Sequence, residues 1–151
     1  MKIIKVNGYC LSSTYGDGNV FGQPEGVKSI GLVEVHTDSG LVGIGETYTG
    51  VYVPELIEPI VKTIESLVVG KNPLDIEDVY NSMEIPFVSM NGFVRSIIGA
   101  IEIALWDIKG QVEEKPIYEL LSDTYTNDFG VYASGGSVSF STDDIKGDVD
   151  K

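Results

Sequence analysis

Residues 97–121 read IIGAIEIALWDIKGQVEEKPIYELL, and this stretch decides how the rest of the chain is organised. Apolar residues recur at alternating intervals of four and three, which places them on one stripe of an α-helix that must be buried. The stripe consists of Val94, Ile98, Ile101, Leu105, Ile108 and Val112. Gly99 and Gly110 have no side chain, so we expect another backbone to approach the helix closely there. Pro116 predicts a short second helix over 116–121.

The composition is that of one ordinary globular domain. The chain has 151 residues, of which 42% are hydrophobic and 22% are charged, and this length is sufficient for a single core. A formal net charge of −13 argues against binding to nucleic acid or to an anionic membrane surface, because phosphate contacts need clustered lysine and arginine. No apolar run reaches the ~18 residues of a membrane span, and no signal-peptide core is present. We therefore expect a soluble protein.

Cysteine and histidine each occur once. Cys10 alone excludes an internal disulfide and a cysteine-rich zinc site, and it favours a reducing, cytoplasmic compartment. His36 lies between Val35 and Thr37 in a β-branched stretch, so we interpret it as a structural residue of a strand.

Three strands precede the helices. We predict them over 2–11, 29–37 and 41–46 from their β-branched residues and alternation. Asp38-Ser39-Gly40 fits a hairpin turn with a left-handed glycine, so the strands form an antiparallel meander. In the first strand, we expect Ile4, Val6 and Cys10 to share one face. In the other two, we expect one face of the sheet to be covered by Val33, Val35, Val42 and Ile44.

The segment 12–26 predicts a long loop, because it holds four glycines and Pro24 and keeps no periodicity. Loops of this length tend to be functional lids or disordered segments, and both readings stay open. Tyr15, Val20 and Phe21 favour a lid, since a purely solvated linker has no need of apolar side chains.

Helices follow the sheet. Apolar residues at helical spacing predict a helix that ends at Gly70, and Asn72-Pro73 predicts the cap and first position of the next helix. The two predicted buried faces are Ile57, Ile60, Val61, Ile64, Leu67 and Val68 in the first helix and Ile76, Val79, Tyr80 and Met83 in the second. A three-stranded meander followed by a helical bundle is the order of an α+β fold.

The tail has a different character. Residues 129–133 are strand-like, and a helix start follows at Thr142 before the chain stops at Lys151. A strand followed by the start of a helix is the first half of a β/α unit, whose partner strand is missing.

Several motifs occur together in an order that identifies a family. They are Gly43-Ile44-Gly45-Glu46, Val69-Gly70-Lys71-Asn72-Pro73, residues 100–110 (AIEIALWDIKG) continuing through Lys115-Pro116-Ile117-Tyr118-Glu119-Leu120-Leu121, and Val131-Tyr132-Ala133-Ser134. With these motifs the chain resembles the N-terminal capping domain of the enolase superfamily, in its mandelate racemase/muconate lactonizing enzyme branch. The resemblance implies a cap over residues 1–125, and over 126–151 the first strand and the start of the first helix of an incomplete β/α barrel.

The resemblance also implies a chemistry. The isomerases and lyases of this family abstract the proton α to a substrate carboxylate with the help of Mg²⁺, which leads to isomerisation, cycloisomerisation or dehydration. Their bases and metal ligands stand on barrel strands, and a barrel takes roughly 200 residues or more. We therefore assign no catalytic and no metal-binding residue to this chain, and we expect it to be inactive alone.

The resemblance does assign the role of a cap. In the family, the loop after the first strand folds over the barrel mouth and helps to select the substrate, and a second cap segment lies nearby. The matching lid residues here are Tyr15, Val20, Phe21, Tyr48 and Tyr52. We expect a small carboxylate substrate in the complete enzyme. We also expect a homo-oligomer or association with a barrel-bearing chain, because the faces that normally meet the barrel are exposed.

Two other classes of function stay open. A non-catalytic binding module could keep the cap fold without a barrel, but such a module has no need of residues 131–134 or of the helix start at Thr142. A small independent enzyme could use Glu46 or Asp107, provided that either carboxylate lies in a closed pocket with a strongly raised pKa.

Overall fold

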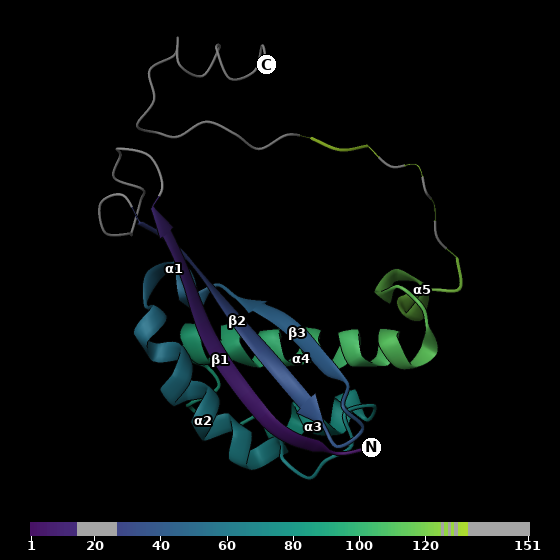
Figure 1. Cartoon of the computed structure of the whole chain (residues 1–151), viewed down its shortest axis with the longest axis horizontal. Coiled ribbons are helices and arrows are strands. Elements are labelled where there is room, and N and C mark those ends of the chain that lie inside the picture. Colours follow the sequence, from purple (N-terminus) through teal and green to yellow (C-terminus); the bar gives the residue numbers. More distant parts are fainter. Residues whose placement is uncertain (15–26, 125, 127, 129, 133–151) are drawn as a thin grey trace.

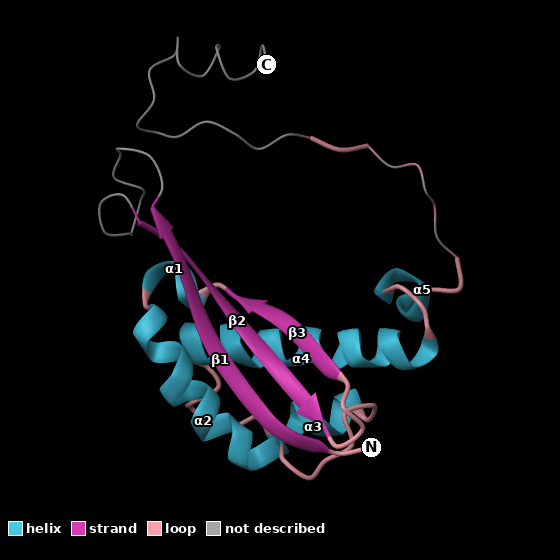
Figure 2. Ribbon diagram, in the orientation of Figure 1, coloured by secondary structure: helices cyan, strands magenta, loops and turns pink. Residues whose placement is uncertain are grey.

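The computed structural model describes residues 1–14, 27–124, 126, 128 and 130–132. Figure 1 and Figure 2 show a three-stranded sheet with helices behind it, so one face of the sheet is covered and the other is open. The elements are β1 (Ile3–Thr14), β2 (Val27–Thr37), β3 (Val42–Thr47), α1 (Thr49–Tyr52), the 3₁₀ turn η1 (Pro54–Leu56), α2 (Ile57–Val68), α3 (Ile76–Ser82), α4 (Gly92–Glu113) and α5 (Ile117–Leu121). The predicted α+β order of strands followed by helices is confirmed.

The sheet has the predicted antiparallel order β1-β2-β3. The turn between β2 and β3 is also as predicted, with Gly40 at φ +87° and its N–H donating to the Thr37 carbonyl at 3.1 Å. β1 continues past its predicted end at Leu11 as far as Thr14, because its last three residues still pair with β2. The predicted loop therefore starts after Thr14, and residues 15–26 lie outside the described part of the chain.

The buried face of β1 differs from the prediction. Ile3 and Val6 are buried, whereas Ile4 is 55% exposed and Cys10 is exposed too. The pairing with β2 shifts register between Ile3 and Lys5. Such a bulge inserts one residue and reverses the alternation on either side of it, so Ile4 faces away from Val6.

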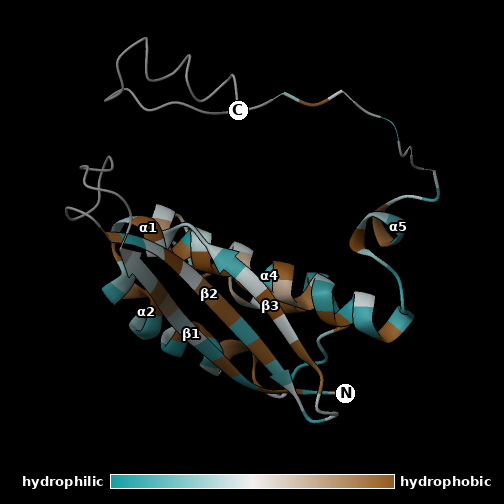
Figure 3. Ribbon diagram, turned by 45° about the horizontal axis from the view of Figure 1, so that its top comes forward, coloured by the Kyte–Doolittle hydropathy of each residue, from teal (hydrophilic) through white to brown (hydrophobic). Residues whose placement is uncertain are grey.

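The third strand turns its glycines, and not its branched residues, toward the helices. Gly43 and Gly45 pair with the two buried valines of β2, whereas Ile44 is 49% exposed on the open face. The prediction that Val42 and Ile44 cover the same face as those valines is therefore wrong. Figure 3 shows hydrophobic and hydrophilic residues alternating along the chain of β2, whose side chains point by turns to the covered face and to the open face.

The helix α4 packs directly against the backbone of β3. A Cβ atom at Gly43 would lie 2.0 Å from the Ala104 carbonyl oxygen, and one at Gly45 would lie 1.9 Å from that of Ala100. The close approach expected at Gly99 is absent, because nothing lies within 4 Å of a Cβ built there. The two glycines of the strand thus allow the helix to approach closely, and the backbones of Ala100 and Ala104 contact them.

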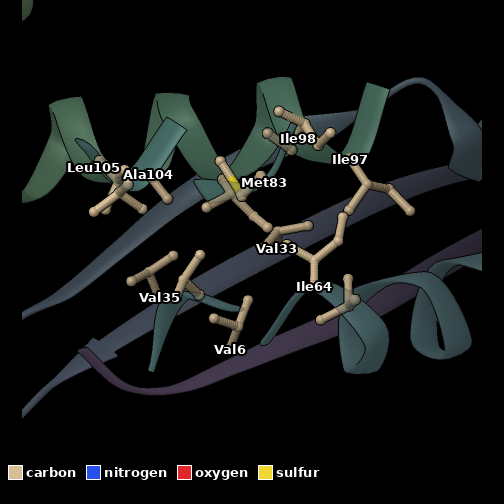
Figure 4. Close-up of a cluster of buried hydrophobic side chains, with 14 of the residues drawn as sticks. Val6, Val33, Val35, Ile64, Met83, Ile97, Ile98, Ala104 and Leu105 are labelled. Atoms are coloured by element: carbon tan, nitrogen blue, oxygen red, sulfur yellow. The ribbon is translucent and has the colours of Figure 1, made fainter. Parts of the chain in front are cut away.

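The predicted apolar stripe of α4 forms the centre of the core. Its fully buried members are Ile98, Ile101, Leu105 and Ile108, and the neighbouring Ile97 is buried as well. Figure 4 shows part of this cluster against Val33 and Val35 of the sheet, with Ile64 and Met83 completing it. Burying each large apolar side chain contributes about 1.5–3 kcal/mol. Val112 is an exception at 42% exposed, since the preceding Gln111 already reaches the first residue of β3 and no sheet remains to cover the next turn.

The helix α2 ends at Val68, two residues before the predicted end at Gly70, which adopts φ +88°. The N–H of Gly70 donates to the Ile3 carbonyl at 2.8 Å and so ties this turn to β1. The next helix begins later than predicted, because Asp75 and not Asn72 is the N-cap of α3. The Asn72 side chain accepts the N–H of Leu74 at 3.3 Å, a local turn that competes with helix formation.

The end of α4 leads directly into the short helix α5. Glu114 ends α4 in the left-handed conformation with φ +53°, and at Gly110 the predicted close backbone approach is found, since a Cβ would lie 2.8 Å from the Lys115 carbonyl oxygen. α5 follows with Pro116 as its N-cap. Of the strand predicted over 129–133, the described residues 130–132 form no strand, because none of the described strands pairs with them. The helix predicted from Thr142 lies outside the described residues.

Candidate functional site

Two of the five predicted lid residues lie in the described part of the chain. Tyr48 precedes α1 and Tyr52 ends it, and their rings pack edge to face with centroids 5.2 Å apart. Their hydroxyl oxygens are 3.1 Å apart. Tyr48 is 62% exposed and Tyr52 is 37% exposed, so the pair presents two phenols to solvent. Tyr15, Val20 and Phe21 lie outside the described residues, and their contacts stay a prediction.

Hydroxyl groups hold α1 in place, because a helix of one turn is not stable by itself. Ser96 of α4 is the central group: its hydroxyl oxygen lies 2.9 Å from that of Thr47 and accepts the N–H of Tyr48 at 3.0 Å. The hydroxyl of Thr49 donates to the Phe93 carbonyl at 3.2 Å. Both threonines are only 1% exposed. The helix that carries the tyrosine pair therefore packs on buried hydroxyl groups that form hydrogen bonds.

The same short helix lies on the hairpin that carries the predicted lid. A Cβ atom at Gly50 would lie 2.0 Å from the backbone nitrogen of Gly31, so the two backbones are in contact. Beyond this contact the β1–β2 hairpin continues to its last pair, Thr14 and Val27. The structure thus brings the two ends of the predicted lid segment and the tyrosine pair onto one hairpin.

The chemistry of the tyrosine pair is that of hydrogen bonding. The hydrogen bond with Tyr48, together with partial desolvation, raises the pKa of the Tyr52 phenol above its ordinary value. The phenol therefore stays protonated at neutral pH and can donate or accept a hydrogen bond. Such a group can bind or orient a carboxylate or hydroxyl group, but it is not poised to abstract a proton.

A polar cluster on the open face of the sheet contains the only histidine. The Nε2 atom of His36 lies 2.9 Å from Glu34 Oε2 and 3.1 Å from the Asn7 amide nitrogen, and the Asn7 amide also donates to the Tyr9 hydroxyl at 2.9 Å. Burial opposes ionisation of Glu34, but hydrogen bonds from His36 and Tyr9 outweigh it and lower the pKa of this carboxyl group. Hydrogen bonding to Glu34 raises the pKa of Tyr9. These contacts agree with a structural interpretation of His36.

The two carboxylates considered for an independent enzyme do not form a site together. Asp107 accepts the backbone N–H of Ile44 through Oδ2 at 2.9 Å, and one turn later Gln111 donates to the Val42 carbonyl at 2.8 Å. Both side chains therefore pair with the outer edge of β3, which no further strand covers among the described residues. Glu46 is exposed. This role of Asp107 was missed by sequence reasoning, although its spacing of four from Gln111 places both on one face of the helix.

A hollow of about 840 Å³ lies between α3 and α4. Trp106 lines it, with the Lys109 amine 5.2 Å above the indole ring. Neither Glu46 nor Asp107 lines this cavity or the groove of about 540 Å³ between β1 and α2.

The described residues hold neither a cluster of metal-ligating side chains nor a membrane-spanning helix. No three or more His, Cys, Asp or Glu side chains in this part of the chain are grouped to hold a metal ion. None of the helices there combines the length and the apolar character that a membrane crossing needs.

Comparison with known proteins gives consistent matches. The family model of the mandelate racemase / muconate lactonizing enzyme N-terminal domain matches residues 24–122. The D-xylonate dehydratase of Haloferax volcanii is 38% identical over 104 residues, which are 67% of this chain and 24% of that enzyme. The hydrophobic dipeptide epimerase of Enterococcus faecalis is 34% identical over 94 residues, or 60% of this chain and 25% of the enzyme. The chain thus spans about a quarter of the length of these relatives.

A solved structure extends the match to the fold. The crystal structure of an enolase superfamily member from Polaromonas sp. JS666 superposes with a TM-score of 0.82 and 25% identity, and the match covers 99% of this chain and 40% of the other. The relatives as a group are dehydratases, epimerases and cycloisomerases. Motif order, fold and family model agree: the chain belongs to the mandelate racemase / muconate lactonizing enzyme family of the enolase superfamily, and it corresponds to the N-terminal domain of that family.

Proposed function

We propose that this chain is the substrate-capping part of a mandelate racemase/muconate lactonizing-type enzyme and that it catalyses nothing alone. The observation that carries the proposal is the match of the N-terminal family model over residues 24–122, with a chain that spans a quarter of its relatives. We divide the chain into a cap over 1–125 and the beginning of a barrel over 126–151. In support of this division, α5 is the last described helix and ends at Leu121.

On this proposal, the complete enzyme abstracts the proton α to the carboxylate of a small substrate with the help of Mg²⁺. Isomerisation, cycloisomerisation or dehydration then follows. A carbon acid is too weak for a side-chain base unless a cation stabilises the charge that develops on the carboxylate oxygens. We place the base and the metal ligands in barrel residues outside this chain. The names of relatives such as D-xylonate dehydratase and L-rhamnonate dehydratase favour a sugar acid as the substrate.

Within this enzyme the tyrosine pair and the segment 15–26 close over the barrel mouth. Exclusion of water and contact with the non-reacting part of the substrate set specificity, and neither supplies a base. The buried seat of α1 supports this role for Tyr48 and Tyr52, because groups that orient a substrate must themselves be held rigidly. We propose Tyr15, Val20 and Phe21 as further contacts.

The test compares this chain with the complete enzyme that results when the reading frame is extended through a barrel. The 151-residue chain should show no turnover of D-xylonate or L-rhamnonate with Mg²⁺, whereas the complete enzyme should exchange the α-proton of its substrate with solvent deuterium. In the complete enzyme, Tyr52→Phe and Phe21→Ala should raise KM or change substrate preference, with little effect on α-proton exchange. Turnover by the short chain, or a stop codon after Lys151 with no barrel encoded nearby, would overturn the proposal in favour of a binding module.

The partners and the compartment follow from the same proposal. We propose that the chain forms a homo-oligomer or associates with a barrel-bearing chain. Exposed apolar residues at its end, such as Val131 at 83% and Tyr132 at 90%, support such contacts. The single cysteine, which forms no internal disulfide, supports a cytoplasmic location.

A further inference from the structure

We propose that Ser96 of α4 is a positioning residue for substrate specificity, and that it acts through the backbone that carries the tyrosine pair. This inference rests on the proposed capping role of Tyr48 and Tyr52, and it places one determinant of that role in the central helix of the core. Ser96 is not a catalytic residue, because its hydroxyl group is engaged with the Tyr48 N–H and the Thr47 hydroxyl.

The start of α1 lacks a local cap. The helix has four residues, and its N-cap Tyr48 forms no capping hydrogen bond through its side chain. The first N–H groups of any helix have no partner within the helix, and one turn gains too little from its own hydrogen bonds to persist alone. The orientation of α1 must therefore be fixed by groups that lie outside it.

Two hydroxyl groups together supply the missing cap. The hydroxyl oxygen of Ser96 accepts the N–H of Tyr48 at 3.0 Å, and that of Thr47 accepts the N–H of Thr49 at 3.3 Å. The two hydroxyl oxygens lie 2.9 Å apart, so one of them donates its proton to the other. Two consecutive amides are thus satisfied as they would be by a serine or threonine N-cap, but half of this cap comes from α4.

The core fixes the position of Ser96 itself. One turn later in α4, the Ala100 carbonyl oxygen lies against the backbone of Gly45, where a Cβ atom would be only 1.9 Å away. The next two residues of the helix, Ile97 and Ile98, are 0% exposed. Because protein interiors are close-packed, Ser96 cannot shift relative to the end of β3. Its hydrogen bonds therefore hold the start of α1 at a defined place on the domain.

Other contacts hold the rest of α1. A Cβ atom at Gly50 would lie 2.0 Å from the Gly31 nitrogen, so the middle of the helix rests on the backbone of β2. The hydroxyl of Thr49 donates to the Phe93 carbonyl at 3.2 Å. Both contacts remain when the Ser96 hydroxyl is removed. We therefore expect α1 to stay on the domain while its first turn loosens.

The tyrosine pair is sensitive to such loosening because the core does not hold its rings. Tyr48 is 62% exposed and Tyr52 is 37% exposed, and the two rings contact each other with their hydroxyl oxygens 3.1 Å apart. The N–H that Ser96 accepts belongs to Tyr48, so loss of this bond lets the Tyr48 ring move relative to Tyr52. Groups that orient a substrate must be held within about 0.5 Å of the productive geometry.

The first experiment measures the geometry of the tyrosine pair in the 151-residue chain, as the nuclear Overhauser contact between the rings of Tyr48 and Tyr52. Ser96→Ala should weaken this contact severalfold, whereas Ser96→Thr, which keeps the hydroxyl, should retain it. Alanine favours the helix, so the melting temperature should show that the fold is kept. The matched control is Ser66→Ala, which removes a hydroxyl that donates to the Thr63 carbonyl at 2.9 Å within α2. It should leave the ring contact unchanged.

The second experiment measures kinetics in the complete enzyme. Ser96→Ala should raise KM by about three- to tenfold, which is the contribution of one or two hydrogen bonds, with kcat and α-proton exchange near those of the wild type. Ser96→Thr should return KM to the wild-type value. A merely structural role would instead lower the amount of folded enzyme and leave KM unchanged.

The two experiments separate this inference from the proposed function. The role of Ser96 is overturned by an unchanged ring contact in Ser96→Ala, by an equal loss in Ser66→Ala, or by a Ser96→Thr chain that behaves like Ser96→Ala. A ring contact that is lost while KM stays unchanged would refute the capping role of the tyrosine pair and, with it, the effect of Ser96 on specificity.

Discussion

Replacing Gly45 by alanine is expected to be one of the most damaging single-methyl changes in this chain. The new Cβ atom would lie 1.9 Å from the Ala100 carbonyl oxygen, a backbone atom that no side-chain rotation can remove. Either α4 or β3 must retreat by more than about 1 Å, and α4 carries the centre of the core. Overpacking of this kind costs about 3 kcal/mol, a large part of the ~5–15 kcal/mol that stabilises a domain.

The assay is urea unfolding followed by circular dichroism, which gives the free energy of unfolding and its denaturant slope. A loss of about 3 kcal/mol corresponds to a melting temperature lower by ~10 °C. Gly99→Ala is the matched control, because nothing lies within 4 Å of a Cβ there. Inside a helix this change should stabilise by up to about 1 kcal/mol. The reasoning is refuted if Gly45→Ala stays within about 0.5 kcal/mol of the wild type, or if both variants shift in the same direction.

Two further predictions concern carboxylates with assigned hydrogen bonds. Asp107→Ala leaves the Ile44 N–H without its acceptor and should cost about 1–2 kcal/mol; faster amide exchange at Ile44 checks this, and unchanged exchange would contradict the hydrogen bond. For Glu34, the folded-state pKa is lowered from 4.5, so its stabilisation is complete above the unfolded pKa and is lost as the pH falls through the folded pKa. Glu34→Gln should therefore flatten the loss of stability below about pH 4.5, measured as the urea midpoint against pH; an acid limb equal to that of the wild type would count against the cluster.

Local sequence patterns correctly predicted those elements whose sequence signals lie within a few residues of one another. The stripe from Ile98 to Ile108 has helical spacing, and the structure buries it fully, because only one face of a helix can meet a sheet. Gly40 also predicted its turn correctly, because few residues other than glycine tolerate φ +87°.

The sequence patterns predicted the wrong buried residues where a single residue changes which face of the strand its neighbours occupy. The bulge near Ile4 reverses the faces of β1, and a bulge leaves no mark in the alternation of residue types. In β3 the branched Ile44 was expected inside, but Gly45 occupies the buried face. The error arises because hydrophobic alternation assumes that a partner helix needs side chains to pack on, whereas α4 packs on the backbone.

In the candidate site, too, the sequence predicted some residues, whereas their geometry is known only from the structure. Tyr48 and Tyr52 were found through the resemblance of motifs, which carries information on residue identity but none on geometry. That their rings pack together with hydroxyl oxygens 3.1 Å apart depends on Ser96, which comes from a helix more than forty residues away in sequence. Asp107 was considered as a catalytic residue, but its partner Ile44 is 63 positions away, and no local pattern connects them.

By itself the sequence determined the class of fold, the order of the elements, the central helix and the family. These properties follow from periodicity, turn residues and motifs, which depend on residues close together in the chain. Only the tertiary structure decided which face of each strand is buried, why β3 needs glycine, what Asp107 binds and how Ser96 of α4 holds the segment that carries Tyr48. These depend on the distances between segments remote in sequence, and such distances are set by the packing of the whole core.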